Sequence, residues 1–289
     1  MRPESWTSLS NATVLVTGAS GFIGRHVCRM LAEADAIVHG VSRRATPFGP
    51  FVRQWHQANL ADPAAVDALL VAARPDYLLH LAGHVMGSRD LAHVGPAFDN
   101  NLHATVNLLR AVTGTACRRI VMTGSLEEPA TADEAPSSPY AASKAAASLY
   151  AKMFYRLYGT PVTMTRVFMV YGPGQSDTRK LVPYVTLSLL GGQPPALSSG
   201  VRPVDWVHVA DVAAALIGCC VTPGLEGQTV DIGTGRLTTV RRVAEQIGRL
   251  IGGRGPVFGS VEDRPLEQVR VADPTQAQAI LGRSFVDLD

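Results

Sequence analysis

The chain has 289 residues, of which 46% are hydrophobic and 17% are charged, so it can form one large α/β domain or two lobes around a sizeable core. Its net charge is only +2 at pH 7, and no run of Lys and Arg exceeds two residues. This pattern excludes the strongly basic surface of a nucleic-acid-binding protein, and we expect no nucleic-acid partner.

Three further patterns narrow the class of protein. The longest apolar run, residues 212–221, is too short to cross a bilayer, and the first eleven residues lack the apolar core of a secretory signal. The cysteines form no C-x-x-C pair, and the eight histidines show no metal-ligand spacing. We therefore expect a cytoplasmic protein with reduced thiols, no membrane contact and no metal. The four cysteines are Cys28, Cys117, Cys219 and Cys220.

Strand and helix patterns alternate along the first 170 residues. The sequence predicts strands over 12–17, 36–41, 77–82, 119–124 and 161–168, with helices over 22–34, 62–73, 97–113 and 140–158 between them. This alternation predicts an α/β fold, a doubly wound parallel sheet covered by helices on both faces.

After the turn at residues 171–173 the strand and helix patterns no longer alternate regularly. Helices are predicted over 177–190, 209–220, 238–251 and 274–281, separated by glycine- and proline-rich turns. We predict a dinucleotide-binding domain over 11–170, completed by short later returns of the chain. Residues 171–289 would form mainly a smaller C-terminal substrate-binding lobe, with a ligand cleft between the two.

A glycine-rich run joins the first predicted strand to the first predicted helix. It reads Thr17-Gly18-Ala19-Ser20-Gly21-Phe22-Ile23-Gly24. The unpaired N–H groups and positive dipole of a helix N-terminus attract phosphate, and glycines let a pyrophosphate approach the backbone. The run favours a dinucleotide site, and the alternative is an ordinary βα turn with incidental glycines.

A tyrosine and a lysine lie one helical turn apart at the start of the predicted 140–158 helix. Ser138 can cap this helix, and Pro139 suits its first turn. Tyr140 and Lys144 are then i and i+4 on one face. A tyrosine with a pKa of about 10 exchanges protons near pH 7 only if the phenolate is favoured, which a nearby ammonium does. The alternative is an accidental pair on an amphipathic helix.

Ser125 follows the predicted strand at 119–124. Ligands of parallel sheets bind at the carboxyl ends of strands, so this serine can hydrogen-bond a substrate oxygen. The alternative is a turn serine that caps a helix.

Together these motifs resemble the short-chain dehydrogenase/reductase (SDR) superfamily, and most closely its extended branch, the nucleotide-sugar (NAD-dependent) epimerase/dehydratase family. The resemblance covers residues 12–281 and implies a Rossmann-like fold. Further motifs in the matching order are Leu81-Ala82-Gly83, the run from Asn101 to Asn107, the runs 166–173 and 202–211, Asp231-Ile232-Gly233-Thr234-Gly235 and the segment from Asp273 to Gly282.

The resemblance implies catalytic roles for four residues. Tyr140 would be the acid/base, Lys144 would hold the nicotinamide ribose and lower the tyrosine pKa, and Ser125 would orient the reacting oxygen. Glu127 matches a glutamate that serves as a base in dehydratases and also occurs in other members. The implied cofactor-binding residues are Gly18, Ser20, Gly21, Phe22, Ile23, Gly24, Ser42, Arg43, Arg44, Asn59, Leu60, Leu81, Ala82, Gly83, Asn101, Tyr140, Lys144 and Val167.

The end of the second predicted strand bears on the choice of cofactor. An NAD enzyme usually places Asp or Glu there to bind the ribose 2′-hydroxyl, whereas this chain has Ser42, Arg43 and Arg44. Arginine suits a 2′-phosphate. The sequence favours NADP(H), and NAD(H) is possible if both arginines are only surface charges.

The resemblance also implies substrate contacts. Arg202 and Arg264 match positions where relatives grip a sugar-nucleotide diphosphate, and Glu267 matches an acid that binds the nucleotide ribose. Met169 stands where relatives have an asparagine that contacts substrate. Met169 thus departs from the family pattern, whereas the two arginines and Glu267 indicate a nucleoside-diphosphate-sugar substrate.

The sequence therefore predicts NADPH-dependent reduction of a 4-keto sugar nucleotide. A 4-epimerase or 4,6-dehydratase with a recycled cofactor is the alternative, although Leu126 stands where many dehydratases have an aspartate. A non-sugar carbonyl reductase and an NADP-sensing binding protein are more distant alternatives. By resemblance, a homodimer packed through the helices near 97–113 and 140–158 is expected.

Overall fold

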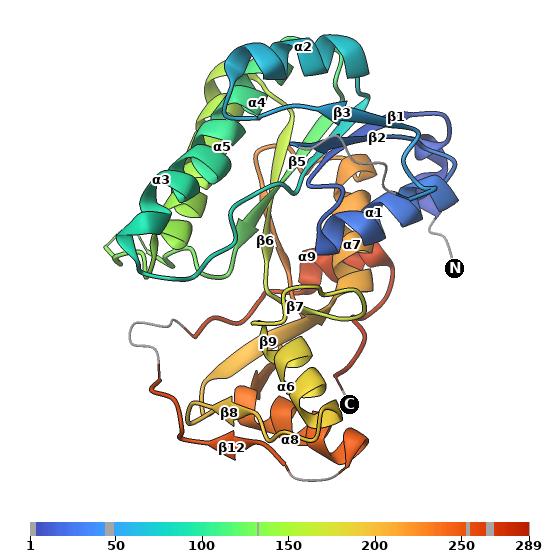
Figure 1. Cartoon of the computed structure of the whole chain (residues 1–289). Helices are drawn as coiled ribbons and strands as arrows, with labels where there is room; N and C mark the ends of the chain where they lie inside the picture. Colours follow the sequence, from blue (N-terminus) through green and yellow to red (C-terminus); the bar gives the residue numbers. More distant parts are fainter. Residues whose placement is uncertain (1–3, 44–48, 132, 253–254, 264–268, 289) are drawn as a thin grey trace.

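The computed structural model describes residues 4–43, 49–131, 133–252, 255–263 and 269–288. Within these ranges, a seven-stranded parallel sheet forms the larger part of the molecule (Figure 1). Its strands in spatial order are β3 (Gln54–Gln57), β2 (Ile37–Ser42), β1 (Thr13–Thr17), β4 (Tyr77–His80), β5 (Arg119–Ser125), β6 (Val162–Val167) and β10 (Thr229–Ile232). The chain runs outward from β1 in both directions, so the predicted doubly wound, Rossmann-like sheet is confirmed.

Helices cover both faces of the sheet because its strands alternate between two cores. Val14 and Val16 belong to the core under one set of helices, and Leu15 between them belongs to the other core. The first set contains α1 (Phe22–Glu33), α7 (Val209–Val221) and α9 (Thr275–Leu281). The second contains α2 (Pro63–Ala73), α4 (Ala104–Val112) and α5 (Pro139–Tyr158).

A smaller group of elements lies below the sheet in Figure 1. It contains a sheet of β11 (Leu237–Thr239), β9 (Pro203–His208) and β7 (Met169–Tyr171), and the pair β12 (Val257–Phe258) and β8 (Ala196–Leu197). Helices α6 (Leu181–Leu190) and α8 (Val240–Ile251) pack beside them around two small apolar cores. Although α7, β10 and α9 come late in the sequence, they return to the large sheet.

Two buried aspartates explain why the motif at 202–211 is rich in polar residues. Asp205, 1% exposed, accepts hydrogen bonds from the backbone N–H groups of Thr234, Gly235 and Ala272. Asp211 pairs with Arg283 and accepts the N–H of Val286. Both carboxylates therefore tie late segments of the chain together and do not reach the cleft described below.

The predicted strands agree with the structure to within two residues at their ends, and the differences elsewhere have physical causes. The short edge strands β3 and β10 were not predicted, because β3 has no buried residue and β10 has only two. The predicted 97–113 helix begins earlier, as α3 (Val94–Ala97), and includes a π-helical turn, η3 (Phe98–His103), before α4. The predicted 177–190 helix begins at Leu181, because the Asp177 side chain accepts the Arg179 N–H in a turn.

In the part of the chain that the structure describes, η1 (Glu4–Leu9) and η2 (Leu91–His93) are short 3₁₀ helices. All four cysteines are buried free thiols. Across the ranges given above, no helix combines the length and the apolar character needed to cross a membrane.

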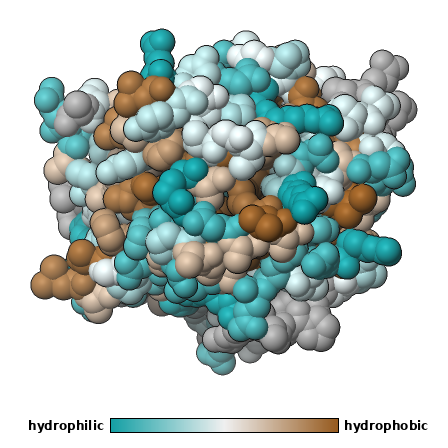
Figure 2. Space-filling model, turned by 90° about the horizontal axis from the view of Figure 1, so that it is seen from above, coloured by the Kyte–Doolittle hydropathy of each residue, from teal (hydrophilic) through white to brown (hydrophobic). Residues whose placement is uncertain are grey.

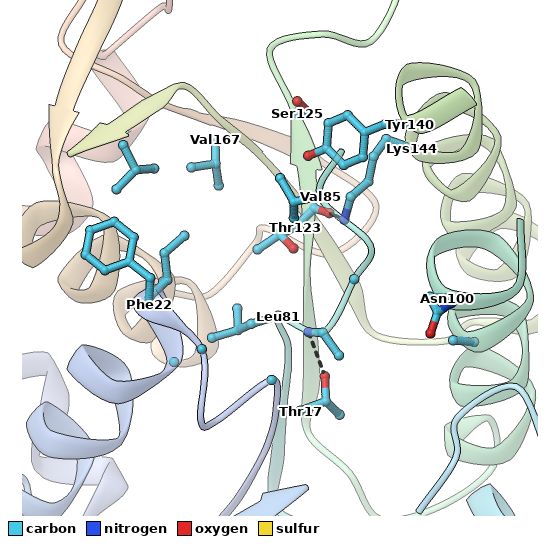
Figure 3. Close-up of a pocket in the computed structure, with 18 of the residues that line it drawn as sticks. Thr17, Phe22, Leu81, Val85, Asn100, Thr123, Ser125, Tyr140, Lys144 and Val167 are labelled. Carbon is cyan, nitrogen blue, oxygen red and sulfur yellow. Dashed lines mark hydrogen bonds between the residues drawn. The ribbon is translucent and has the colours of Figure 1, made fainter. Parts of the chain in front are cut away.

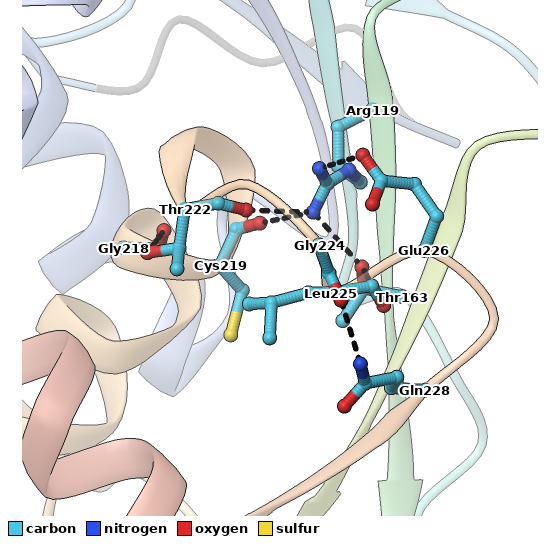
Figure 4. Close-up of polar contacts among 9 residues, drawn as sticks. All are labelled: Arg119, Thr163, Gly218, Cys219, Thr222, Gly224, Leu225, Glu226 and Gln228. Atoms are coloured by element: carbon cyan, nitrogen blue, oxygen red, sulfur yellow. Dashed lines mark hydrogen bonds and ion pairs between the residues drawn. The ribbon is translucent and has the colours of Figure 1, made fainter.

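A buried arginine fastens the amino end of β5 to the far end of α7 (Figure 4). Arg119 is 4% exposed and forms an ion pair with Glu226. Its guanidinium also donates to the Thr163 hydroxyl at 3.2 Å and to the carbonyl oxygens of Cys219 at 3.1 Å and Thr222 at 3.2 Å. Since the last carbonyls of a helix lack intrahelical partners, this side chain completes the end of α7.

Candidate active site

A cleft of about 1040 Å³ opens at the carboxyl ends of β1, β2, β4, β5 and β6 (Figure 3). The N-terminus of α1, the first turns of α5 and the segment after β7 complete its wall. This is where ligands bind in open α/β sheets, on either side of the point at which the strand order reverses. The described residues that the sequence predicted and that line the cleft are Gly18, Ser20, Gly21, Phe22, Ile23, Gly24, Ser42, Arg43, Asn59, Leu60, Leu81, Ala82, Gly83, Ser125, Glu127, Tyr140, Lys144 and Val167.

The glycine-rich turn has the shape that a pyrophosphate cradle needs. Gly18 has φ +69°, and a Cβ there would lie 2.7 Å from the Ala82 nitrogen. A Cβ on Gly24 would overlap the Gly18 carbonyl. Gly21 is the N-cap of α1, and no side chain caps the helix. The first N–H groups of α1 therefore stay available to an anionic ligand, which fits the diphosphate of a dinucleotide.

The loop after β4 packs directly against this turn. The Thr17 hydroxyl accepts the Ala82 N–H at 3.2 Å and contacts His80 Nδ1 at 2.7 Å. His80 Nε2 lies 3.1 Å from the Thr105 hydroxyl. Burial and the nearby Lys144 lower the pKa of His80 to about 3, so this ring is neutral at pH 7. The sequence did not predict this buried polar chain, since His80 lies inside an apolar strand.

Asn101, a predicted cofactor-binding residue, connects two segments of the chain. It is 1% exposed and does not line the cleft. Its Oδ1 accepts the His84 N–H at 2.7 Å, and its Nδ2 donates to the Ser143 hydroxyl at 2.9 Å. The side chain therefore holds the loop after β4 against α5, and its neighbour Asn100 faces the cleft instead.

The end of β2 carries no carboxylate on the cleft side. Ser42 and Arg43 line the cleft there, and Arg43 Nη1 donates to Asn100 Oδ1 at 3.2 Å. This hydrogen bond holds the guanidinium across the space between β2 and η3. Arg44 lies outside the described residues.

Ser125, Tyr140 and Lys144 converge at the end of β5, as Figure 3 shows. Ser138 is the N-cap of α5 and accepts the Ala141 N–H at 3.2 Å, with Pro139 in the first turn, as predicted. Tyr140 is 8% exposed, and its ring lies beside Ser125 (Figure 3). Lys144 is 7% exposed, and its Nζ donates to the Thr123 carbonyl at 2.7 Å.

Burial acts on both titratable groups of this cluster. It raises the pKa of Tyr140, interaction with the Ser125 side chain lowers that pKa, and the charges of Glu127 and Glu128 raise it. Burial lowers the pKa of Lys144 to about 8, while Glu128 opposes that shift. Strongly perturbed groups that meet in a cleft are typical of catalytic sites.

The turn after Ser125 carries two acidic residues with different surroundings. Glu127 lines the cleft, and its N–H donates to the Ser125 hydroxyl at 3.2 Å. Glu128 points away from the cleft lining and is 6% exposed. Leu126 precedes them and is also buried. The sequence prediction included Glu127 and missed Glu128, because two adjacent glutamates give no sign of which one is buried.

The predicted substrate contacts are less well supported. Arg202 precedes β9 and does not line the cleft, while Arg264 and Glu267 lie outside the described residues. The structure instead adds a polar group from the segment after β7, which the sequence did not single out because that loop has no periodic pattern. This group is Gln175, Ser176, Asp177 and Lys180. No group of three His, Cys, Asp or Glu residues within the described ranges could hold a metal ion.

Comparison with known proteins agrees with this geometry. Residues 14–233 match the model of the NAD dependent epimerase/dehydratase family. The chain belongs to this family. It is therefore an enzyme of the extended SDR type, and the resemblance inferred from the motifs is confirmed.

Curated relatives match almost the whole chain. The dTDP-glucose 4,6-dehydratase of Neisseria meningitidis serogroup B is 30% identical, and the match covers 90% of this chain and 84% of the relative. The enzyme of the same name from Streptomyces griseus is 32% identical, with 93% and 88% covered.

Solved structures show the same architecture. The Bordetella bronchiseptica enzyme WbmF in complex with NADH has a TM-score of 0.81 and 26% identity, covering 98% of this chain and 90% of that one. The UDP-glucose 4-epimerase of Thermus thermophilus in complex with NAD has a TM-score of 0.78 and 27% identity, covering 92% of each.

Proposed function

We propose that this enzyme interconverts the C4 hydroxyl and the C4 ketone of a nucleotide-linked hexose, without elimination of water. The observation that carries the proposal is the meeting of Ser125, Tyr140 and Lys144 in the cleft beside Leu126. Elimination needs a group that protonates the departing hydroxyl, and a leucine side chain cannot do so. Leu126 therefore favours a reaction without elimination, while the relatives named dehydratases favour the alternative, which the assays below test.

In this proposal Tyr140 exchanges a proton with the sugar O4, and Ser125 donates a hydrogen bond to the same oxygen. Burial raises the pKa of Tyr140, so phenolate must be favoured by its surroundings. The ammonium of Lys144, one helical turn along α5, has the required charge. A bound nicotinamide supplies the hydride chemistry, and the glycine cradle and open α1 N-terminus fit its dinucleotide.

We further propose that the favoured direction is NADPH-dependent reduction of a 4-keto sugar. Ser42 and Arg43 at the end of β2 support NADP(H), because no carboxylate there repels a 2′-phosphate and a guanidinium can bind it. NAD(H) is the alternative cofactor. A 4-epimerase with a recycled cofactor is the second candidate, supported by the neighbour named UDP-glucose 4-epimerase.

The proposed substrate is a nucleoside-diphosphate sugar, with the cofactor held by residues 11–170 and returning segments and the nucleotide by the smaller lobe within 171–289. Arg202, Arg264 and Glu267 are the proposed diphosphate and ribose contacts. Competition by UDP and dTDP tests this directly, since Arg202→Ala should weaken their inhibition about tenfold, the scale of one charge-assisted hydrogen bond. If neither nucleotide binds while NADPH does, a non-sugar carbonyl reductase replaces this proposal.

One set of assays separates the reactions. A 4-keto dTDP-hexose with NADPH should be reduced with equal consumption of both compounds. Conversion of UDP-glucose to UDP-galactose with no net change in cofactor would instead identify an epimerase. Formation of a 4-keto-6-deoxy sugar from dTDP-glucose would contradict the proposal, because it requires loss of water.

A homodimer in the cytoplasm completes the proposal. Large apolar side chains are exposed along α3, η3 and α5, among them Val94, Phe98, Leu149 and Leu157, of which Leu149 is 67% exposed. By contrast, Figure 2 shows apolar patches scattered among polar residues on the face seen from above. Leu149→Glu should shift a dimer toward monomer in light scattering, and an unchanged mass would contradict this arrangement.

A further inference from the structure

Glu128 is a buried acidic residue that takes no part in the proposed reaction. Both oxygens of its carboxylate nevertheless accept hydrogen bonds. Oε1 accepts the Ser125 N–H at 2.7 Å, and Oε2 accepts the Ser148 hydroxyl at 2.8 Å. Burial of a carboxylate costs free energy unless hydrogen bonds compensate it, so these two contacts are what allow Glu128 to lie there.

The contacts of Glu128 converge on one face of α5. Tyr140, Lys144 and Ser148 are four residues apart in turn, so they lie along one side of the helix. The Glu128 side chain contacts Ser148, the last of the three, and the N–H of Ser125. The side chain of Ser125 in turn lies beside Tyr140, the first of the three (Figure 3). One carboxylate therefore joins the end of β5 to the helix face that carries the reacting groups.

The backbone is shaped to admit this carboxylate. A Cβ on Gly124 would lie 3.3 Å from the carboxyl carbon of Glu128 and would overlap Oε1. The Glu128 N–H donates to the Ser125 carbonyl at 3.1 Å, and its carbonyl accepts Arg270 Nη1 at 2.9 Å. The side chain and the main chain of Glu128 are therefore both fixed by hydrogen bonds, which keep the carboxylate beside Ser125 and Ser148.

The charge of Glu128 acts on both titratable groups of the site. It favours the ammonium form of Lys144, against the effect of burial, and it disfavours the phenolate form of Tyr140. His80, the other titratable group beside Lys144, is neutral at pH 7. Among the residues that the structure describes, the other charged groups that act on Tyr140 or on Arg270 are Glu127, Glu134, Arg166 and Asp231.

We propose that Glu128 is a positioning residue of this active site. Its carboxylate holds the Ser125 peptide in register with Tyr140, and its negative charge keeps Lys144 protonated. The inference rests on the proposed roles of Tyr140 and Lys144. Glu128 does not line the cleft, so in this proposal it acts through these neighbours.

Two substitutions of Glu128 separate the effect of its charge from the effect of its side-chain length. Glu128→Gln keeps the length and a carbonyl acceptor for the Ser125 N–H but removes the charge. Glu128→Asp keeps the charge and withdraws it from Ser125 by one methylene. Glu134→Gln is the matched control, because it removes a carboxylate from an exposed position in the same loop.

The effect of the Glu128 charge on the pKa of Lys144 can be measured without substrate. The chain has three lysines, Lys144, Lys152 and Lys180, so ¹³C-lysine-labelled protein gives three NMR titration curves. Lys144 should titrate near pH 8 in the parent enzyme and about one unit lower in Glu128→Gln, the scale of a nearby opposite charge. Glu134→Gln should leave the curve unchanged. An unshifted Lys144 curve in Glu128→Gln would overturn the electrostatic role.

Turnover of a 4-keto dTDP-hexose with NADPH tests the consequence. Loss of Lys144 protonation at lower pH should move the alkaline limb of the kcat/KM profile of Glu128→Gln to lower pH. Glu128→Asp should lower kcat about tenfold without moving either limb of the pH profile. If Glu128→Gln does not fold, Glu128→Asp alone tests the proposal. Parent-like kcat in Glu128→Asp would contradict the positioning of Ser125. If Tyr140→Phe is fully active, the proposed function fails; if Tyr140→Phe is inactive and the Glu128 variants behave as the parent, only this inference fails.

Discussion

A cationic side chain is buried at each end of β5, and the two side chains have different surroundings. At the amino end, Arg119 is enclosed by the Thr163 hydroxyl, two carbonyls and the carboxylate of Glu226 (Figure 4). At the carboxyl end, Lys144 donates to the Thr123 carbonyl and also lines the cleft. The first cation is surrounded by protein groups, whereas the second faces space for a ligand.

This difference follows from where each end of a parallel strand lies. The amino end of β5 meets the end of α7 and must satisfy helix carbonyls, so a guanidinium with several donors is useful there. The carboxyl end faces the opening between helices, where a single ammonium can change its protonation. Buried charge alone therefore does not mark a catalytic residue, and exposure to a cleft separates the two cases.

The largest effect is expected for Tyr140→Phe. The change removes one hydroxyl from a buried ring, so folding should be little affected, while loss of proton transfer should lower the rate about 10²- to 10⁴-fold. Steady-state kinetics and thermal unfolding measured together check both parts. Turnover close to that of the parent would show that the carboxyl end of β5 is not the reacting end.

Arg119→Met should act on stability instead. It leaves Glu226 and helix carbonyls without their partner, so unfolding free energy should fall by about 3–5 kcal/mol. The neighbouring Arg118→Met is the matched control, because Arg118 is 61% exposed in its ion pair with Asp76 and should change stability by only about 0–1 kcal/mol. Denaturant unfolding compares the two. Equal losses would remove the distinction between the buried and the exposed arginine.

Lys144→Met should stabilise the ligand-free protein while it abolishes activity. Burial lowers the pKa of Lys144 from 10.5 to about 8, so below pH 8 the protonated lysine destabilises the folded state by about 3 kcal/mol. The variant avoids this cost but loses the hydrogen bond to Thr123, so its unfolding free energy should be higher than that of the parent by roughly 1–3 kcal/mol. Between pH 8 and 10.5 the unfolded chain binds the proton and the folded chain does not, so the parent recovers this stability as pH rises. Denaturant unfolding of the parent and the variant at about pH 7 and about pH 10 tests this pH dependence. If the variant exceeds the parent in unfolding free energy by more at pH 10 than at pH 7, the prediction is wrong.

An effect of similar size to that of Lys144→Met, but confined to binding, concerns the cofactor. Arg43→Ala should weaken NADPH binding by about 1.5–3 kcal/mol, the scale of a charged hydrogen bond, and should change NADH binding much less. Arg53→Ala is the control, because Arg53 lies next to β3 and does not line the cleft. Calorimetric titration of both cofactors distinguishes the cases. Equal losses for NADPH and NADH would assign Arg43 to general attraction of phosphate.

Much of the active site could be predicted from sequence because it depends on local rules. The glycines at 18, 21 and 24 are needed where the backbone turns or meets another segment at close range, and such needs leave a short motif. The Ser138 cap and the four-residue spacing of Tyr140 and Lys144 follow from helix geometry. The parallel sheet with helices on both faces followed from the alternation of predicted strands and helices.

Other features were decided only by the tertiary structure. The family resemblance singled out Glu127, but no local pattern shows that Glu128 is buried beside it. Nor does the sequence show that Asn100 lines the cleft and Asn101 does not, because this depends on the π-helical turn of η3. The role of Arg119 depends on α7, about a hundred residues away in the chain, and on Glu226 beyond it. Local patterns determine which segments form helices, strands and tight turns, whereas the partner of each buried polar group depends on which distant segments pack together.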